Sequence, residues 1–78
     1  MQEIFEDLIK LQRNKILSCA QRIVPHVTQE DLLQPNDYPL LEQNPHFRYE
    51  EGVLEGLLTA RMAYLVSLKE SFSYDDVN

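Results

Sequence analysis

The sequence has one cysteine, no tryptophan, two glycines and few basic residues, and these shortages exclude several classes of protein. A single cysteine, Cys19, cannot form a disulfide within the chain, which favours a reducing compartment, so we expect a cytoplasmic location. Seven lysines and arginines against 13 aspartates and glutamates give an acidic chain with a net charge of −6. A protein that binds duplex nucleic acid presents a basic face to the phosphates, so nucleic acid is not an expected partner.

Long hydrophobic runs and catalytic motifs are also missing. Uncharged stretches such as Met62 to Leu68 are far shorter than the ~20 apolar residues that cross a bilayer, and the first residues are acidic where a signal peptide is basic. The sequence holds no glycine-rich phosphate loop, no Gly-x-Ser-x-Gly, no Cys-x-x-Cys and no stripe of basic and aromatic residues. We therefore expect neither a membrane partner nor a cofactor.

The length and the hydrophobic periodicity predict one small domain that begins with a long helix. The chain has 78 residues, of which 44% are hydrophobic and 26% are charged. Over about residues 3–24, apolar residues recur at steps of three and four, which is typical of an amphipathic helix. Gln12 interrupts the apolar face and is expected at its edge. Pro25 ends the pattern, because the residue before a proline avoids the helical conformation.

A second long helix is predicted over about residues 45–72. Asn44 suits the N-cap position and Pro45 suits the first helical position. From Phe47 onward, apolar residues follow one helical face for about seven turns. Residues 73–78 are short and acidic, and predict a frayed tail.

The segment between the two helices, about residues 28–43, predicts one or two short helical turns, the first of them capped by Thr28. The expected fold class is therefore all-α: an antiparallel hairpin of two long helices with short turns between them. A hairpin of this kind leaves one side of its apolar faces exposed. We expect a second copy, in a dimeric bundle, or another protein to complete the core.

Both glycines lie inside the second predicted helix. Gly52, Gly56 and Ala60 follow one another at steps of four and form a strip of small residues. Each glycine inside a helix costs about 1 kcal/mol relative to alanine, and the close approach of another helix would compensate for this cost. Three interpretations are open: the first helix of the chain packs against the strip, a helix of another molecule docks there, or the backbone approaches a small ligand.

The start of the second helix combines a capping residue with aromatic and charged residues. In one interpretation, Phe47 anchors the helix to the core and Tyr49 shields it. In the other, Arg48 and Tyr49 form a docking point for a partner, because both residue types are enriched in interface hot spots.

Candidate chemistry is sparse. His46 and Glu50 lie four residues apart, but the repeated Glu-x-x-His elements of helical di-metal proteins are missing, so no metal site is expected. Cys19 lies near the apolar face of the first helix, where a cysteine usually acts as a small buried hydrophobic residue, and we do not expect a nucleophile there.

Negative charge is concentrated in the second half of the chain, where residues 35–78 hold three basic and eight acidic residues. Such a half either steers a basic partner or simply forms a solvated face. Mimicry of nucleic acid ranks last among the functional interpretations, because Glu51 and Glu55 are the one regularly spaced acidic pair there.

The sequence predicts a non-catalytic protein–protein interaction module: an adaptor, a small chaperone or a regulatory subunit. The proposed docking or helix-packing residues are Arg48, Tyr49, Gly52, Gly56 and Ala60. The alternative is a small helical enzyme whose site lies between subunits. It requires at least two of Arg13, Arg48 and Arg61 to converge on a pocket for an anionic substrate.

Overall fold

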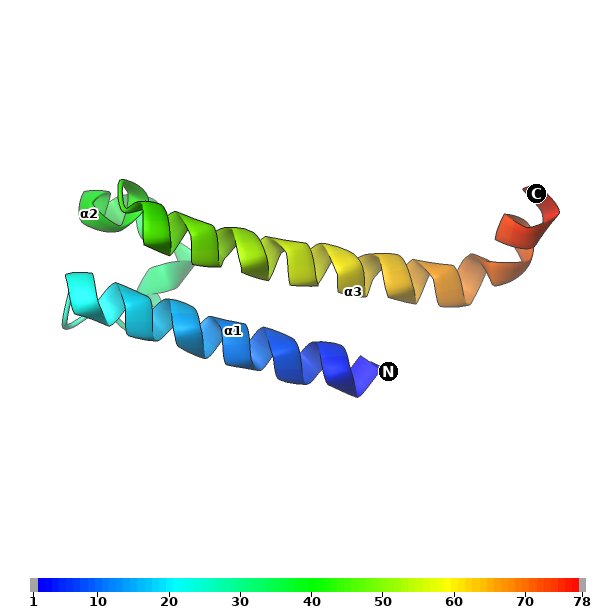
Figure 1. Ribbon diagram of the computed structural model, residues 1–78, viewed down its shortest axis with the longest axis horizontal. Coiled ribbons are helices and arrows are strands. Elements are labelled where there is room, and N and C mark those ends of the chain that lie inside the picture. Colours follow the sequence, from blue (N-terminus) through cyan, green and yellow to red (C-terminus); the bar gives the residue numbers. More distant parts are fainter. Residues whose placement is uncertain (1, 78) are drawn as a thin grey trace.

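The chain is an antiparallel hairpin of two long helices in the computed structural model, which describes residues 2–77 and, within them, the side chains of residues 3–69 (Figure 1). Helix α1 spans Gln2–Ile23 and helix α3 spans Pro45–Val77, and the two pack against each other. Every regular element within residues 2–77 is a helix, and this part of the chain has no strand. The predicted all-α class and the two packed long helices are confirmed.

The ends of the helices follow from local chemistry. α1 ends at Ile23, two residues before Pro25, and the amide of Val24 still donates to the carbonyl of Ala20 at 2.7 Å. α3 begins at Pro45, and the side-chain oxygen of Asn44 accepts a hydrogen bond from the amide of Phe47 at 2.9 Å, as an N-cap residue does.

The far end of α3 differs from the prediction. The helix continues to Val77 instead of ending near residue 72. The side chains of the predicted acidic tail, residues 73–78, lie outside the described residues. The continuation makes α3 about 50 Å long, against about 33 Å for α1, so α3 extends well past the first residue of α1 (Figure 1).

The middle segment, residues 24–44, contains three short helical pieces: the 3₁₀ turns η1 (Asp31–Leu33) and η2 (Pro35–Asp37) and the single-turn helix α2 (Pro39–Glu42). Before η1, the Asp31 carboxylate accepts hydrogen bonds from the Thr28 amide at 2.9 Å and from the Thr28 hydroxyl at 3.1 Å. The Thr28 hydroxyl oxygen accepts one from the Asp31 amide at 3.4 Å. This reciprocal pair fixes the chain where it turns back toward the helices.

The hydrophobic core lies at the end of the hairpin that the middle segment covers, which we call the closed end. Phe47 of α3 and Leu41 of α2 are fully buried there, and Val27 is almost fully buried. The core cluster comprises Ile16, Cys19, Ala20, Val24, Val27, Leu41 and Phe47. Of the two adjacent leucines of α2, Leu41 enters the core whereas Leu40 is 65% exposed.

At the opposite end of the hairpin, which we call the open end, the described residues place no third element over the two helices (Figure 1). Here the ring centroids of Phe5 and Tyr64 lie 5.7 Å apart, and the Arg61 guanidinium donates to the Glu6 carboxylate at 2.7 Å. Ile9 is buried between the helices. These few contacts hold α1 against α3 beyond the core.

The adjacent leucines of α2 provide a matched test of this core. Leu41→Ala should lower the free energy of unfolding by about 2–5 kcal/mol, because it leaves a cavity in the core. Leu40→Ala should change it by less than about 0.5 kcal/mol, because the side chain faces solvent. Urea unfolding followed by circular dichroism measures both. Equal losses would contradict the assignment of Leu41 to the core.

Candidate interaction surfaces

The predicted strip of small residues faces solvent. Gly52, Gly56 and Ala60 are all exposed, and a Cβ atom added to either glycine would meet nothing within 4 Å. The side of α3 that faces α1 is the one that carries Phe47 and Leu54. The interpretation that the first helix packs closely on the strip is therefore wrong for the described chain, and docking by another molecule stays a prediction.

Tyr49 lies in line with this strip, and Arg48 lies beside it. Tyr49, Gly52, Gly56 and Ala60 follow at steps of three, four and four, which places them on the outer face of α3, and the Tyr49 ring is largely exposed. The Arg48 guanidinium lies 3.3 Å from the Glu51 carboxylate and 3.7 Å from that of Glu42. The interpretation of Phe47 as the core anchor agrees with its complete burial, whereas Tyr49 is 67% exposed.

The open space around the glycines predicts a gain of stability when they are replaced. Gly52→Ala and Gly56→Ala should each raise the free energy of unfolding by about 1 kcal/mol, because alanine lowers the entropic cost of forming a helix. Chemical denaturation measures this change. A loss of stability would instead show that another backbone approaches the strip in solution.

A chain of polar contacts crosses from α1 to α3 at the edge of the core. Gln12, 5% exposed, is buried and does not lie at the edge of the apolar face as predicted. Its amide donates to the backbone carbonyl of Glu50 at 2.9 Å and to the Glu50 carboxylate at 2.7 Å. The other carboxylate oxygen of Glu50 lies 3.2 Å from His46 Nε2, and His46 Nδ1 lies 3.7 Å from the sulfur of Cys19.

The order thiol, imidazole and carboxylate is the one that activates a cysteine nucleophile in enzymes. Here the sulfur of Cys19 belongs to the core cluster and the residue is 2% exposed, so no substrate reaches it in this conformation. The contacts therefore tie the two helices together, in agreement with the interpretation of Cys19 as a small buried residue. Within the described residues, no group of three or more histidines, cysteines, aspartates or glutamates is placed to hold a metal ion.

The neighbouring carboxyl groups of Glu50 and Glu51 are shifted in opposite directions. The hydrogen bond from Gln12 lowers the pKa of Glu50, and the contact with His46 lowers it further. Burial raises the pKa of Glu51, and the nearby carboxylates of Glu42 and Glu55 add to this rise against the effect of Arg48. The stabilising contribution of Glu50 is present above its unfolded pKa and is lost as the pH falls through its lowered folded pKa.

Gln12→Leu tests this link. The variant should return the pKa of Glu50 toward its ordinary value, and losing the bond to the Glu50 carbonyl should cost about 1 kcal/mol. The pKa of Glu51 should stay raised and serve as an internal control. Carboxyl carbon NMR across a pH titration measures both groups. An unchanged Glu50 pKa would contradict the role of Gln12.

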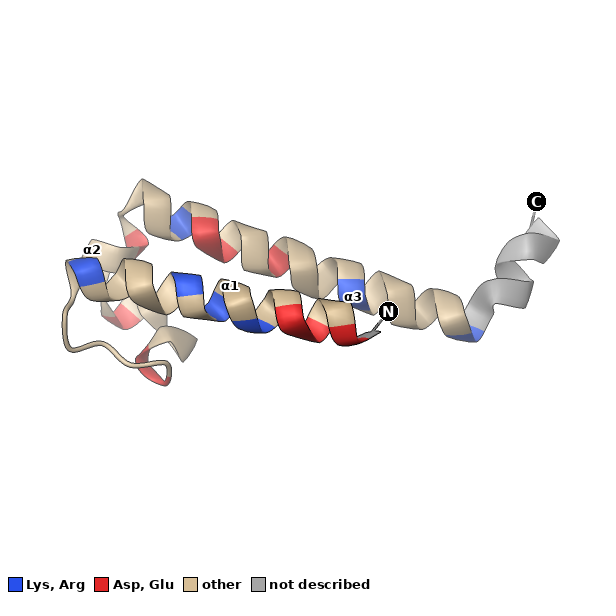
Figure 2. Cartoon of the chain, turned by 60° about the horizontal axis from the view of Figure 1, so that its bottom comes forward, with Lys and Arg blue, Asp and Glu red and all other residues tan. Residues whose placement is uncertain are grey.

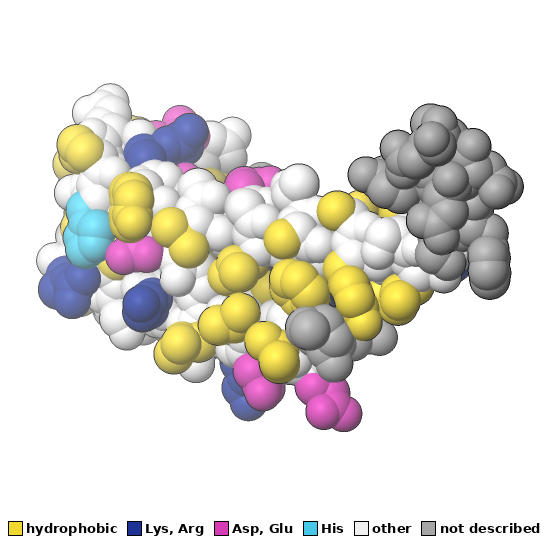
Figure 3. All heavy atoms as spheres, turned by 45° about the vertical axis from the view of Figure 1, so that its right-hand side comes forward, with side chains coloured by type: hydrophobic (Ala, Val, Ile, Leu, Met, Phe, Trp, Pro, Cys, Tyr) yellow, Lys and Arg dark blue, Asp and Glu magenta, His cyan; other side chains and the backbone are white. Residues whose placement is uncertain are grey.

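Hydrophobic side chains of both helices form one patch on a flank of the open end (Figure 3). From α1, the exposed Ile4, Leu8 and Leu11 follow at steps of four and three. A shallow site that includes Leu11, Lys15 and Glu50 shows that this flank of α1 adjoins Glu50 of α3. On α3, Leu57, Tyr64 and Leu68 follow Glu50 by 7, 14 and 18 residues, which places them on the same side of the helix as Glu50. We call the set the lateral apolar face: Ile4, Leu8, Leu11, Leu57, Tyr64 and Leu68.

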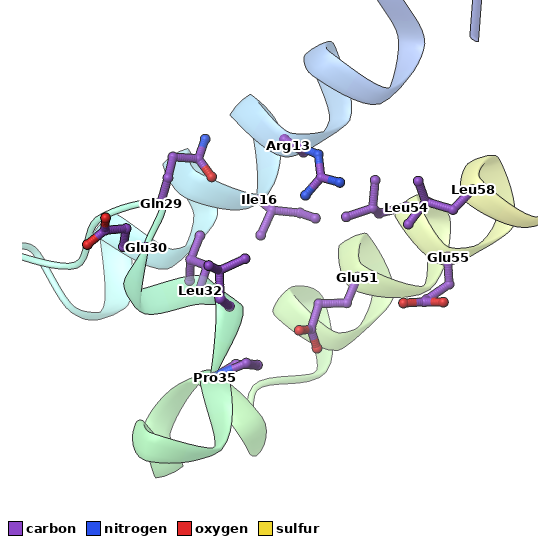
Figure 4. Close-up of a pocket in the computed structure, with 11 residues that line it drawn as sticks. Arg13, Ile16, Gln29, Glu30, Leu32, Pro35, Glu51, Leu54, Glu55 and Leu58 are labelled. Carbon is purple, nitrogen blue, oxygen red and sulfur yellow. The ribbon is translucent and has the colours of Figure 1, made fainter. Parts of the chain in front are cut away.

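A groove of about 650 Å³ lies on the other flank, between α1, the middle segment and α3 (Figure 4). Leu11 and Arg13, which mark the two flanks of α1, are about 200° apart around the helix. The apolar part of the groove is formed by Ile16, Leu32, Leu33, Pro35, Leu54 and Leu58. Its polar part is formed by Arg13, Gln29, Glu30, Glu51 and Glu55. Sequence spacing gave no sign of this groove, because its walls come from three separate elements.

The arginines that the enzyme alternative requires are separated. Arg13 lines the groove, Arg48 pairs with Glu42 and Glu51, and Arg61 pairs with Glu6. Arg48 and Arg61 line neither the groove nor the shallow site at Leu11. The alternative of a small helical enzyme with a site between two subunits stays a prediction.

Comparisons with known proteins identify no relative: no protein-family model matches the chain, and no curated protein or solved structure is significantly similar to it. No helix among the described residues combines the length and the hydrophobicity that crossing a bilayer requires.

Proposed function

We propose that the protein is a non-catalytic protein–protein interaction module, of the adaptor, small-chaperone or regulatory-subunit kind, which pairs with a second copy through the lateral apolar face. The observation that supports this proposal is the exposure of large hydrophobic side chains from both helices along this face: Ile4, Leu8 and Leu11 of α1 and Leu68 of α3. Contiguous apolar surface on a soluble protein is typical of an interaction site.

The charge pattern of α1 favours a second copy of the chain as the occupant. On the flank of α1 that carries Leu11, Asp7 makes the start of the helix acidic, whereas Lys15 and Arg22 make its later part basic (Figure 2). A twofold axis that pairs two α1 helices in antiparallel fashion would set the acidic end of each against the basic part of the other. The same patch would then be complementary to itself, as the interface of a twofold dimer must be.

The surface available is compatible with a dimer of ordinary size. A standard interface buries about 800 Å² on each partner. The chain has 5963 Å² of accessible surface, and the lateral apolar face runs from Ile4 to Leu11 on α1 and from Leu57 to Leu68 on α3. Burying this face would turn the two-helix hairpin into part of a four-helix bundle, whose helices all have a neighbour. The exposed strip at Gly52, Gly56 and Ala60 remains for a further helix.

We also propose a cytoplasmic location. Cys19 is a free thiol in the core, where it lies 3.7 Å from the His46 ring. A chain whose sole cysteine has no partner for a disulfide is typical of reducing compartments. Fractionation of the source cells with an antibody against the protein tests this proposal, and recovery in a secreted or membrane fraction would contradict it.

Leu11→Lys tests the dimer. The substitution places a charge in the proposed interface, and we expect the dimer dissociation constant to rise by at least about tenfold. Leu40→Lys is the matched control, since Leu40 is also an exposed leucine but lies outside the lateral apolar face, and it should leave the constant unchanged. Light scattering over a dilution series measures the mass of each variant.

Two results would overturn the dimer. The first is a wild-type chain that is folded by circular dichroism and has a mass near 9.2 kDa at every concentration. The second is an equal weakening by Leu11→Lys and Leu40→Lys, which would show that added charge, and not its position, controls association.

A further inference from the structure

The groove combines apolar walls with a negatively charged rim. Leu32 and Leu54 pack against the core and present their remaining surface to the groove, while Leu33 is 75% exposed at its edge. Three acidic residues line it, Glu30 on the middle segment and Glu51 with Glu55 on α3 (Figure 4). Its volume of about 650 Å³ lies within the range of established ligand sites.

The positive charges near the groove are fewer than the negative ones. Arg13 enters from α1 and points toward Leu54 and Leu58 (Figure 4). Arg48, outside the groove, approaches the Glu51 carboxylate at 3.3 Å. The residues that line the groove thus include three acidic side chains and one basic side chain.

We propose that this groove binds a basic amphipathic segment of a partner protein, one that inserts apolar side chains between the leucines and sets lysines or arginines against the rim. The binding of an amphipathic helix in an apolar groove is an established mode of recognition, and opposite charges at the rim select the partner. Nucleic acid and acidic peptides are disfavoured, since the rim carboxylates repel them.

The state of Glu51 supports this assignment. Burial and the carboxylates of Glu42 and Glu55 raise the pKa of Glu51, which means that they destabilise its ionised form. A cation that binds at the rim relieves this destabilisation and lowers the pKa of Glu51 again.

The proposal shares with the proposed function the view that the chain is an interaction module, but it uses a different surface. The groove and the lateral apolar face lie on opposite flanks of the hairpin. A dimer formed through the lateral apolar face leaves the groove open, so each proposal is able to fail without the other.

The test is isothermal titration calorimetry with three synthetic peptides of 11 residues, acetylated and amidated at their ends. The first carries leucine at positions i, i+3, i+4 and i+7 and lysine elsewhere. The second replaces every lysine with glutamate, and the third replaces every leucine with serine. The first should bind, with an affinity that falls as salt is added, and the other two should not bind. Absence of binding by the first peptide, or equal binding by all three, would overturn the proposal.

Two pairs of variants locate the site. The double variant Glu51→Gln with Glu55→Gln should weaken binding about fivefold, as the loss of two exposed charge pairs predicts. Glu3→Gln with Asp7→Asn removes the same charge from the start of α1 and should weaken it less than twofold. Leu33→Ser should weaken binding, and Leu40→Ser, a change of the same kind outside the groove, should not. Equal effects within either pair would overturn the groove as the site.

Leu11→Lys separates the two proposals. It should reduce dimer mass in light scattering and leave the affinity for the first peptide unchanged. If dimerisation is absent and the peptide still binds, the proposed self-association fails alone. Loss of peptide binding in Leu11→Lys would place the peptide on the lateral apolar face and overturn the groove.

Discussion

Burial of Phe47 and Leu41 against the last turns of α1 is the interaction on which the rest of the structure depends. Two helices alone cannot enclose a side chain the size of phenylalanine, so a third element must cover it. The middle segment supplies this cover with three short helical pieces. Since residues 24–44 reach one end of the hairpin only, the other end keeps its apolar side chains at the surface. Because only one end of the hairpin is covered, apolar side chains remain exposed at the other end, where a partner is able to bind them.

The polar contact between Gln12 and Glu50 marks the boundary between the two ends. On one side of it lies the enclosed core, and on the other the helices are held by an aromatic pair, an ion pair and Ile9. A buried amide with two hydrogen bonds fixes the register of α1 against α3 more strictly than apolar contacts do. This register determines which residues of α1 lie beside which residues of α3. The contact between Gln12 and Glu50 therefore determines which residues form the groove and which form the lateral apolar face.

Local signals in the sequence account for what could be predicted. The helices follow from periodicity, Pro25 and the Asn44–Pro45 start, which act within a few residues. The direction of the glycine strip could also have been read, because Gly52 lies about 200° from Leu54 around the helix, on the side away from the core. Pairs such as Cys19 with His46, 27 residues apart, depend on the register between helices, and no spacing within either helix specifies that register.

The position of Cys19 gives the protein an internal reporter. Its thiol is enclosed by the core of the closed end, so a reagent that alkylates thiols reacts after that end has opened. When reclosing is faster than alkylation, the rate of labelling is proportional to the population of the opened form. The wild-type chain, which carries no other cysteine, then reports on the breathing of its closed end without any engineered probe.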